Sequence, residues 1–359
     1  MTLAPGQPPA PPCPLHPVVV IGAGGIVKAA HLPAYGLAGF PVAALHDLDS
    51  AKARALAAEF GVPRVCETLA EAVAAAPADA VFDVAVPASA LPAVLAALPD
   101  GAPVLIQKPF GEDLAQARQL LALCQRKRLR AAVNFQLRYA PCVAAARRLI
   151  AAGAIGELHD VEVRVTVHMP WHLWTFLEGL PRVEILYHSV HYVDLIRSFL
   201  GEPRGVYAKT VKHPRTSRLA STRTNIALDY GDLLRANITA NHGHDFGQKH
   251  AESYVKWEGT RGAIKARLGL LLDYQHAQPD ELEICRVDAD GRPGPWQPVP
   301  LEGNWYPHAF IGTMASVMRY ANGESADLPT CVEDAFRTMA VVEAAYESSA
   351  RGATPIPPS

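Results

Sequence analysis

The first part of the chain alternates short apolar runs with alanine-rich stretches of helical period. The apolar runs are rich in β-branched residues and are flanked by glycine, proline or aspartate, which is typical of buried strands. These predicted strands lie at 18–21, 42–45, 81–86, 104–106 and 131–135. Helices are predicted between them at 50–60, 88–98 and 113–128. Strand and helix in this alternation predict a parallel sheet with helices on both faces.

The pattern changes near residue 141. A helix predicted at 142–152 ends at Gly153, and apolar and polar residues then alternate with a period of two. The alternating stretches lie at 158–167, 206–212, 224–229 and 233–240, and helices are predicted at 183–200, 308–320 and 331–351. This alternation predicts a largely antiparallel sheet with one buried face and one more polar face.

These elements predict an α/β protein with two domains. A flexible, proline-rich tail is expected at 1–16, a doubly wound parallel sheet at 17–140, and an α+β domain with a largely antiparallel open sheet at 141–359. The C-terminal helix is expected either within the second domain or packed back on the first. A length of 359 residues suits this division.

Composition narrows the functions that these elements can serve. Half of the residues are hydrophobic and 19% are charged, so the chain can bury sizeable cores. The formal net charge is −2 and no long basic run occurs, so we expect neither nucleic acid nor a membrane as a partner. No apolar run approaches the ~20 residues of a membrane helix.

The cysteines and the N-terminus bear on location. The six cysteines are scattered without a CxxC pair, which favours reduced thiols over a disulfide framework or a zinc site. The N-terminal segment lacks the basic start and the apolar core of a signal peptide. Together these features predict a cytoplasmic protein.

A glycine-rich sequence follows the first predicted strand. Residues 22–27 read Gly-Ala-Gly-Gly-Ile-Val, and a helical stretch comes next. Gly22 permits a tight turn, Gly24 lets the backbone approach a pyrophosphate, and the helix N-terminus offers free N–H groups to that anion. Val27 stands where the GxGxxG pattern has its third glycine. We expect a dinucleotide site here, and the alternative is a glycine turn without a ligand.

Asp47 lies at the end of the second predicted strand, 25 positions after Gly22. A carboxylate at this place accepts hydrogen bonds from the adenosine ribose and repels a 2′-phosphate. No arginine follows Asp47 directly, so the sequence favours NAD over NADP. The alternative is a helix N-cap, for which Asp49 or Ser50 is better placed.

Several motifs, taken in order, resemble the Gfo/Idh/MocA family, the group of glucose–fructose oxidoreductase and inositol dehydrogenase. They are the glycine-rich sequence, Leu-Ile-Gln-Lys-Pro-Phe-Gly at 105–111, Val-Asn-Phe-Gln-Leu-Arg-Tyr-Ala-Pro at 133–141, Gly-Ala-Ile-Gly-Glu-Leu at 153–158, His-Tyr-Val-Asp at 191–194, Glu-Gly-Thr-Arg-Gly at 258–262 and Val-Glu-Ala-Ala-Tyr-Glu-Ser at 342–348. The resemblance implies a Rossmann domain, then an α+β domain whose open sheet builds dimers or tetramers, with the active site between them. We therefore expect a homodimer or homotetramer.

The resemblance also implies roles for single residues. The family's Glu-Lys-Pro lysine, which contacts the substrate hydroxyl and the nicotinamide ribose, falls on Lys108, while its glutamate has become Gln107 and its proline, expected in cis, is Pro109. The cofactor residues expected in all are Gly22, Gly24, Gly25, Ile26, Val27, Asp47, Val86, Pro87, Gln107 and Lys108.

A second family motif carries a histidine with an aspartate four residues before it and another three residues after it. The histidine falls on His191 and the later aspartate on Asp194, but Tyr187 stands in the earlier aspartate's place. With an ordinary pKa of about 6.5, His191 is the expected proton acceptor, whereas Lys108, at about 10.4, suits stabilising an alkoxide unless burial lowers its pKa. Lys108 as a surface residue is the weaker alternative. Tyr187 shares a helical face with His191 and is expected either to relay a proton or to pack in the interior.

Further polar and aromatic residues are candidates for the substrate. Glu184, His188 and His191 recur at helical spacing and could hold a metal, but hydrogen bonding is favoured and we expect no metal site. The segment 168–176 is aromatic and polar, which suits a sugar ring or an oligomer contact. The expected substrate residues are Lys108, Gln136, Arg138, Trp171, His172, His188 and His191, with an acidic partner as the alternative for Arg138.

Taken together, the sequence predicts an NAD-dependent dehydrogenase. The expected reaction is oxidation of a hydroxyl of a sugar, sugar acid or cyclitol, with hydride transfer to nicotinamide. Two alternatives remain open: an NADP(H)-linked sugar carbonyl reductase and a non-catalytic dinucleotide-binding regulator.

Overall fold

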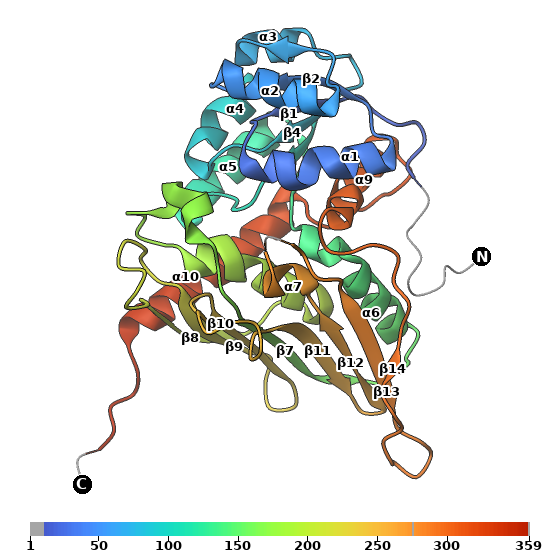
Figure 1. Cartoon of the computed structure of the whole chain (residues 1–359), viewed down its shortest axis with the longest axis vertical. Helices are drawn as coiled ribbons and strands as arrows, with labels where there is room; N and C mark the ends of the chain where they lie inside the picture. Colours follow the sequence, from blue (N-terminus) through green and yellow to red (C-terminus); the bar gives the residue numbers. More distant parts are fainter. Residues whose placement is uncertain (1–10, 275, 358–359) are drawn as a thin grey trace. The chain divides into compact units, whose positions relative to one another are not determined.

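The computed structural model describes residues 11–274 and 276–357, which form two compact units (Figure 1). The parallel-sheet unit comprises residues up to 141 together with 304–339, and the mixed-sheet unit comprises 142–303 together with 340–357. The stretch 304–339, expected in the second domain, is thus part of the first compact unit.

The predicted N-terminal tail is only partly covered by the structure. Residues 1–10 lie outside the described residues. The backbone N–H of Cys13 donates to Glu324 Oε1 at 2.9 Å, and His16 Nδ1 lies 2.6 Å from the Asp79 carbonyl oxygen. The described end of the tail is therefore bonded to the parallel-sheet unit.

Six parallel strands form the first sheet, in the order β3-β2-β1-β4-β5-β6. They are β1 (Val18–Ile21), β2 (Val42–His46), β3 (Val65–Cys66), β4 (Val81–Val84), β5 (Pro103–Ile106) and β6 (Arg130–Val133). Every residue of β1, β4 and β5 is buried, as expected where helices cover both faces. The strand order reverses between β1 and β4, and ligands of such sheets bind at the carboxyl ends beside this reversal.

The helical segments of this unit are η1 (Val27–His31), α1 (Leu32–Ala38), α2 (Ser50–Phe60), α3 (Leu69–Ala74), η2 (Ala88–Ala90), α4 (Leu91–Ala97), α5 (Leu114–Arg126), η3 (Gln136–Tyr139) and α9 (His308–Ala321). The predicted boundaries agree closely where the sequence supplies a cap. Asp49 caps α2 by accepting a hydrogen bond from the Lys52 N–H at 3.0 Å, and Gly61 ends it in the left-handed region. Helix α9 packs its Phe310 and Met314 into the same core as Val20, which explains why this distant segment joins the unit.

Eight strands form the second sheet, in the order β14-β13-β12-β11-β7-β10-β9-β8. They are β7 (Leu158–Thr166), β8 (Gly205–Val211), β9 (Arg223–Asp229), β10 (Arg235–Asn241), β11 (Glu252–Gly259), β12 (Gly262–Arg267), β13 (Glu281–Arg286) and β14 (Gln297–Pro298). Neighbouring strands are antiparallel except β7 and β10. Strands β7 to β10 match stretches predicted from the sequence, whereas β11 to β14 were not predicted.

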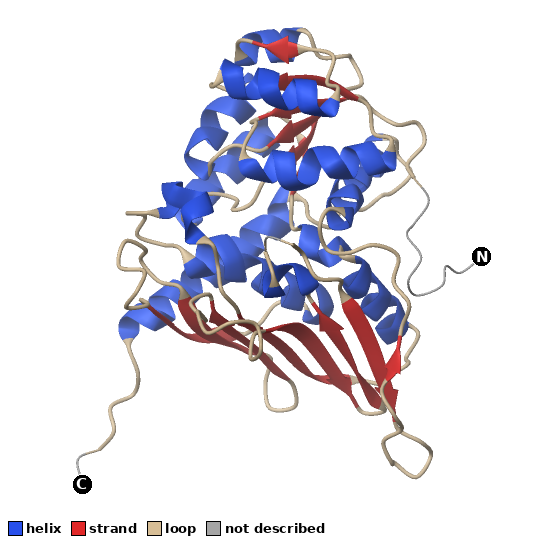
Figure 2. Cartoon of the chain, viewed as in Figure 1, coloured by secondary structure: helices blue, strands red, loops and turns tan. Residues whose placement is uncertain are grey.

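Helices cover one face of this sheet, and the other face carries no helix among the residues drawn (Figure 2). The helical segments of the unit are α6 (Pro141–Ala151), η4 (Trp171–Leu177), η5 (Ile185–Ser189), α7 (Val190–Leu200), α8 (Gly269–Leu272) and the later part of α10 (Val332–Arg351). The helix predicted at 183–200 begins instead as a π-helical turn, η5, before α7.

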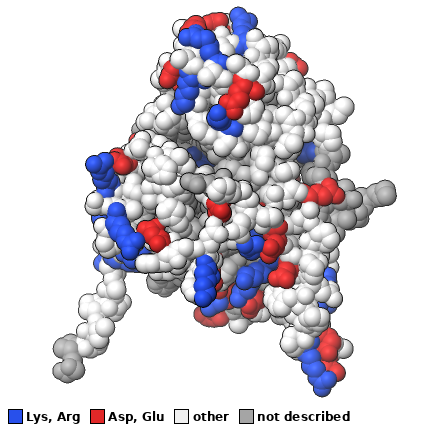
Figure 3. Space-filling view, in the orientation of Figure 1, with Lys and Arg blue, Asp and Glu red and all other residues white. Residues whose placement is uncertain are grey.

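The uncovered sheet face is polar and the covered face is apolar, as the alternation predicts. Ion pairs cross neighbouring strands at Arg164–Glu252 (2.6 Å) and Arg235–Asp160 (2.5 Å). Acidic and basic side chains are interspersed on the surface in view in Figure 3. Within the part of the chain that the structure describes, no helix has the length and apolar character needed to cross a membrane.

Candidate active site

The glycine-rich loop joins β1 to a helix at the carboxyl end of the parallel sheet. Gly22 has φ 110°, and a Cβ atom there would lie 2.3 Å from the Ala85 carbonyl oxygen, so the turn requires glycine. By contrast, no atom lies within 4 Å of a Cβ placed on Gly24 or Gly25. The first N–H groups of a helix lack intrahelical acceptors. The loop therefore offers donors beside open space, which fits a pyrophosphate.

The residue in the third glycine position has a packing role. The side chain of Val27 is fully buried in the core of the parallel-sheet unit, and its N–H donates to the Gly24 carbonyl at 3.0 Å. The Val27 side chain therefore packs in the core, and a cofactor contact of Val27 stays a prediction. Ile26 is partly exposed and keeps the position expected of it.

Asp47 follows β2 at the same edge of the sheet. Its Oδ2 accepts a hydrogen bond from the Ala23 N–H at 2.6 Å, and its Oδ1 accepts one from the Asp49 N–H at 2.9 Å. The carboxylate is partly exposed and is tied directly to the glycine-rich loop. Because Asp49 caps α2, the capping alternative for Asp47 is excluded. After β4, Val86 is partly exposed and Pro87 is exposed.

Lys108 follows β5, again at the carboxyl edge. The Lys108–Pro109 peptide bond is cis, as the resemblance implies. The Lys108 N–H donates to Gln107 Oε1 at 2.9 Å. Burial lowers the pKa of the Lys108 ammonium to about 8. The condition that the sequence analysis left open is thus met, and Lys108 can exchange a proton close to neutral pH.

A buried polar network lies at the carboxyl ends of β4, β5 and β6. His31 Nδ1 contacts Asp83 Oδ2 at 2.7 Å, and the Tyr35 hydroxyl donates to the same oxygen at 2.7 Å. His31 Nε2 lies 3.4 Å from the side-chain nitrogens of Gln107 and Asn134. Burial, and then the charge of Asp83, raise the pKa of the Tyr35 phenol. This network supports the residue that precedes the lysine.

This network was not predicted from the sequence, although one signal for it is present there. Asp83 is an acidic residue in the otherwise apolar strand Val81–Val84, and a carboxylate there needs buried partners. Its partner His31 lies on the helix after the glycine-rich loop, 52 positions away. Only the tertiary structure brings the two together.

The candidate histidines lie in the mixed-sheet unit. His191 is buried at the start of α7, and His188 is partly exposed in the π turn. The His188 ring lies 4.5 Å from the ring of His242, which follows β10, and Trp171 meets both rings edge-on at 5.4 and 6.1 Å. The structure thus joins Trp171 and His188, as expected, with a histidine that had not been assigned to the substrate.

Tyr187 has a different environment. Its ring meets Phe176 edge-on at 6.0 Å and packs against the cluster of Leu177, Val183 and Leu219. Tyr187 lies within the π-helical turn, whereas His191 belongs to α7. These contacts favour the packed alternative for Tyr187.

Three other substrate candidates differ in their surroundings. Arg138 pairs with Asp334 at 2.5 Å and donates to the Pro329 carbonyl at 2.9 Å, which is the acidic partner expected as the alternative. Gln136 is buried. His172 is exposed to solvent.

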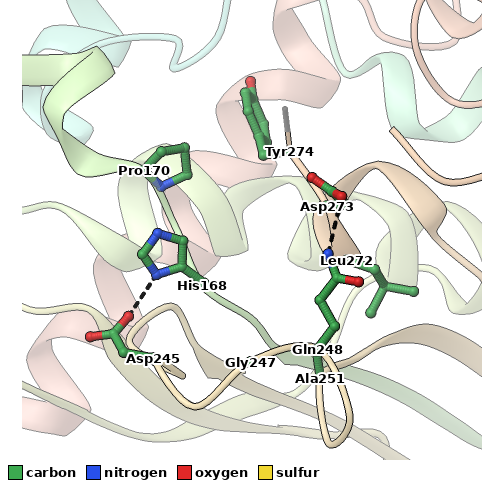
Figure 4. A pocket seen from close by; sticks show the side chains of 9 residues that line it. All are labelled: His168, Pro170, Asp245, Gly247, Gln248, Ala251, Leu272, Asp273 and Tyr274. Carbon is green, nitrogen blue, oxygen red and sulfur yellow. Dashed lines mark hydrogen bonds and ion pairs between the residues drawn. The ribbon is translucent and has the colours of Figure 1, made fainter. Parts of the chain in front are cut away.

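A pocket of about 400 Å³ opens in the mixed-sheet unit (Figure 4). Because β7 and β10 are parallel, the segments that follow them meet at one edge of the sheet. His168, after β7, contacts Asp245, after β10, at 2.7 Å. Across the pocket, Gln248 donates to Asp273 at 3.0 Å, and the ring of Tyr274 is part of the lining. Carboxylates, an amide and an aromatic ring together suit a neutral, hydroxylated ligand.

Metal chemistry was the other possibility for these histidines. In the described parts of the chain, no three His, Cys, Asp or Glu side chains group together as a metal ion would require.

Comparison with known proteins covers both units. Residues 17–135 match the model of the oxidoreductase family with an NAD-binding Rossmann fold, and residues 143–265 match the GFO/IDH/MocA C-terminal domain. D-apiose dehydrogenase of Paraburkholderia graminis is 27% identical over 358 aligned positions, covering 92% of this chain and 87% of the relative.

Solved structures share the fold. An oxidoreductase from Agrobacterium radiobacter, in complex with NAD⁺, L-tartaric acid and magnesium, has a TM-score of 0.76 at 22% identity, covering 94% of this chain and 97% of that one. Levoglucosan dehydrogenase in complex with NADH and levoglucosan has a TM-score of 0.72 at 18% identity, with coverages of 94% and 97%.

Proposed function

Since this chain belongs to the Gfo/Idh/MocA family of oxidoreductases, we propose that it oxidises a hydroxyl of a sugar, sugar acid or cyclitol with NAD. The observation that carries the proposal is Lys108, held after β5 at the carboxyl edge of the parallel sheet with its pKa lowered to about 8. A surface lysine would keep its ordinary pKa of about 10.4.

Different residues of the parallel-sheet unit bind different parts of the cofactor. Gly24 and the helix N-terminus receive the pyrophosphate, and Asp47 accepts from the ribose hydroxyls. When bound, the nicotinamide accepts a hydride from the substrate carbon. NAD is favoured over NADP because the Asp47 carboxylate repels a 2′-phosphate.

Lys108 and His191 have different roles toward the substrate hydroxyl. Oxidation releases the hydroxyl proton, which His191 accepts, and leaves a carbonyl. With a pKa of about 8 Lys108 is still mostly protonated near neutral pH, and its ammonium stabilises the negative charge that develops on the oxygen. His188, Trp171 and the pocket of His168 and Tyr274 bind the remaining hydroxyls and ring faces of the substrate.

The names of similar proteins support a hydroxylated substrate. One relative is named D-apiose dehydrogenase, and one solved neighbour holds levoglucosan. All six cysteines are free thiols, which is compatible with the cytoplasm, the location that we propose. We further propose a homodimer or homotetramer, as the family resemblance implies.

A panel of polyols with NAD⁺, followed by the absorbance of NADH, tests the function. We expect turnover on at least one sugar, sugar acid or cyclitol. Oxidation of NADPH with a sugar carbonyl, and no reaction in the forward direction with NAD⁺, would favour the reductase. Calorimetric binding of NAD with no turnover on any member would favour the regulator.

A further inference from the structure

A buried carboxylate and a buried imidazole face each other in the mixed-sheet unit, and the proposed reaction uses neither. Glu184 precedes the π turn and His242 follows β10, and both side chains are 0% exposed. Glu184 Oε1 lies 3.4 Å from His242 Nε2 and accepts a hydrogen bond from Ser189 Oγ at 2.7 Å. Ser189 comes five residues after Glu184, which is the spacing that the π turn brings together.

Packing alone does not explain why these polar side chains are buried. Burying a carboxylate costs several kcal/mol unless it is well partnered, and an apolar residue at position 184 would avoid that cost. Within the described chain, Glu184 Oε2, both ring nitrogens of His242 and Trp171 Nε1 are buried and have no hydrogen-bond partner. Unsatisfied buried polar atoms are rare and call for a functional reason or an ordered water.

The pair connects to the surface through His188. The His242 N–H donates to the Thr222 carbonyl at 3.0 Å, which fixes the backbone at the end of β10. The His188 ring lies 4.5 Å from the His242 ring at an interplanar angle of 37°, and Trp171 closes the other side edge-on. His188 is partly exposed, so it is the histidine of this stack that can reach a ligand.

Two tyrosines lie close enough to Glu184 for its carboxylate to affect their hydroxyls. Burial, and then the charge of Glu184, raise the pKa of the phenols of Tyr192 and Tyr346. Both therefore stay protonated near neutral pH. Glu184, whose Oε1 lies 3.4 Å from His242 Nε2, is the acidic side chain beside this imidazole.

We propose that Glu184 and His242 are positioning residues that hold the ring of His188 against the substrate hydroxyls. The inference rests on the proposed function, in which His188 binds substrate. Glu184 fixes the ring of His242, and that ring, with Trp171, fixes His188. A substrate bound by His188 then meets a preorganised partner, which is needed for orientation.

Kinetics of Glu184→Gln, His242→Asn and His188→Asn in the full chain test the proposal. Each variant is expected to lower kcat/KM for the best polyol about tenfold or more, while the KM for NAD stays unchanged. The kcat/KM of the double variant His188→Asn/His242→Asn should lie within about threefold of that of His188→Asn, because both changes remove the same interaction. A loss in the double variant equal to the product of the two single losses would show that His242 acts independently of His188 and would overturn the proposal.

A spectroscopic readout does not depend on turnover. In protein labelled with ¹⁵N-histidine, the signals lost in His188→Asn identify His188, and Glu184→Gln should shift those signals. Asp280→Asn is the matched control, because Asp280 is a buried carboxylate of the same unit that accepts from the Gly269 N–H at 2.8 Å. Unchanged His188 signals in Glu184→Gln would overturn the proposal.

Two results separate this proposal from its premise. If Glu184→Gln does not fold, Ser189→Ala removes only the hydroxyl donor to Glu184, and a smaller shift and loss in the same direction are expected. Full activity and unchanged signals in Ser189→Ala would count against the proposal. Absence of turnover in the wild-type chain would overturn the proposed function, whereas normal kcat/KM in Glu184→Gln and His242→Asn together with a loss in His188→Asn would overturn only the positioning role.

Discussion

At the scale of single residues, the environment of a side chain decides its chemistry more than its type does. Lys108 and Tyr187 show this in opposite directions. Burial lowers the pKa of Lys108 to about 8, which brings an ordinarily inert ammonium into the working range. Tyr187 is placed among Phe176, Leu177 and Leu219, where its ring packs. Neither environment follows from the neighbouring letters of the sequence.

The pH dependence of the reaction tests the role of Lys108. If the charged ammonium stabilises an alkoxide, kcat/KM should fall as the pH rises through about 8, because the active form is the protonated one. Lys108→Ala should lower kcat by a factor on the order of 10² or more while NAD still binds. Lys108→Arg keeps the charge, so its loss should be smaller and the alkaline limb should vanish. A rate that instead rises through this pH would make the neutral lysine the base.

The choice between NAD and NADP depends on Asp47. NAD should bind at least tenfold more tightly than NADP, about 1.4 kcal/mol, and Asp47→Ser should narrow this ratio. Asp49→Ala is the control, since it removes the cap of α2 and should cost about 0.5–2 kcal/mol of stability without changing the ratio. Calorimetric titration of the wild-type chain and both variants with NAD and with NADP measures the ratio of affinities. Tighter NADP binding by the wild-type chain would contradict the assignment.

His191 and Tyr187 can be ranked by paired substitutions. His191→Asn should lower kcat/KM by about 10²–10⁴ and flatten the acid limb of its pH profile, because the proton acceptor is lost. Tyr187→Phe keeps the packed ring and should cost at most about tenfold. A larger loss in Tyr187→Phe than in His191→Asn would transfer the proton relay to the tyrosine.

At the scale of elements, the candidate site residues of both units follow the carboxyl ends of parallel strands. In the first sheet the glycine-rich loop, Asp47 and Lys108 follow β1, β2 and β5. In the second sheet the parallel pair β7 and β10 brings together the segments after 166 and 241, including His168 and His242. π-helical turns occur at Val27–His31 and Ile185–Ser189, beside the two buried carboxylate–histidine pairs. Such turns are frequent at functional sites.

Two glycines of one loop should respond differently to the same methyl group. Gly22→Ala should destabilise the fold, because its φ is 110° and the new Cβ would lie 2.3 Å from the Ala85 carbonyl oxygen. The strained backbone conformation alone costs about 1–3 kcal/mol. Gly24→Ala meets no atom within 4 Å, so the chain should fold normally but bind NAD more weakly. Thermal unfolding and calorimetry separate the two effects; unchanged NAD affinity in Gly24→Ala would remove the pyrophosphate from this loop.

At the scale of the whole molecule, each compact unit carries a distinct part of the proposed reaction. The parallel-sheet unit holds the cofactor residues and Lys108, and the mixed-sheet unit holds the histidines and the pocket. The parallel-sheet unit is completed by residues 304–339, so neither unit is one continuous stretch of chain. Truncation near residue 303 would therefore remove α9 from the core of the cofactor-binding unit.

The uncovered face of the mixed sheet bears on the oligomer. Tyr207 of β8 is 71% exposed, and tyrosine is a residue type enriched at protein interfaces. Light scattering should give the mass of a dimer or tetramer, and Tyr207→Lys should lower it. Leu37→Lys, at a residue 64% exposed on α1, is the control and should leave the mass unchanged. A monomeric wild-type protein would contradict the proposed assembly.

The sequence by itself determined the elements whose signals are local. The β-branched runs predicted β1, β2, β4 and β5, and the helical stretches at 50–60 and 113–128 predicted α2 and α5, which Asp49 and Asp113 cap in the structure. The glycine-rich loop and Asp47 predicted a cofactor site. These features depend on backbone sterics, hydrogen bonds within a turn, and strand burial, all of which neighbouring residues fix.

Only the tertiary structure decided the features that depend on distant partners. It placed β11 to β14, the pairing of His31 with Asp83, the ion pair of Arg138, and the cluster of Glu184 with His242. The reason is physical: burial sets the pKa of a lysine and the cost of a carboxylate, and burial results from segments that lie far apart in the chain. Local spacing therefore identified the candidate residues, while packing determined which of them meet.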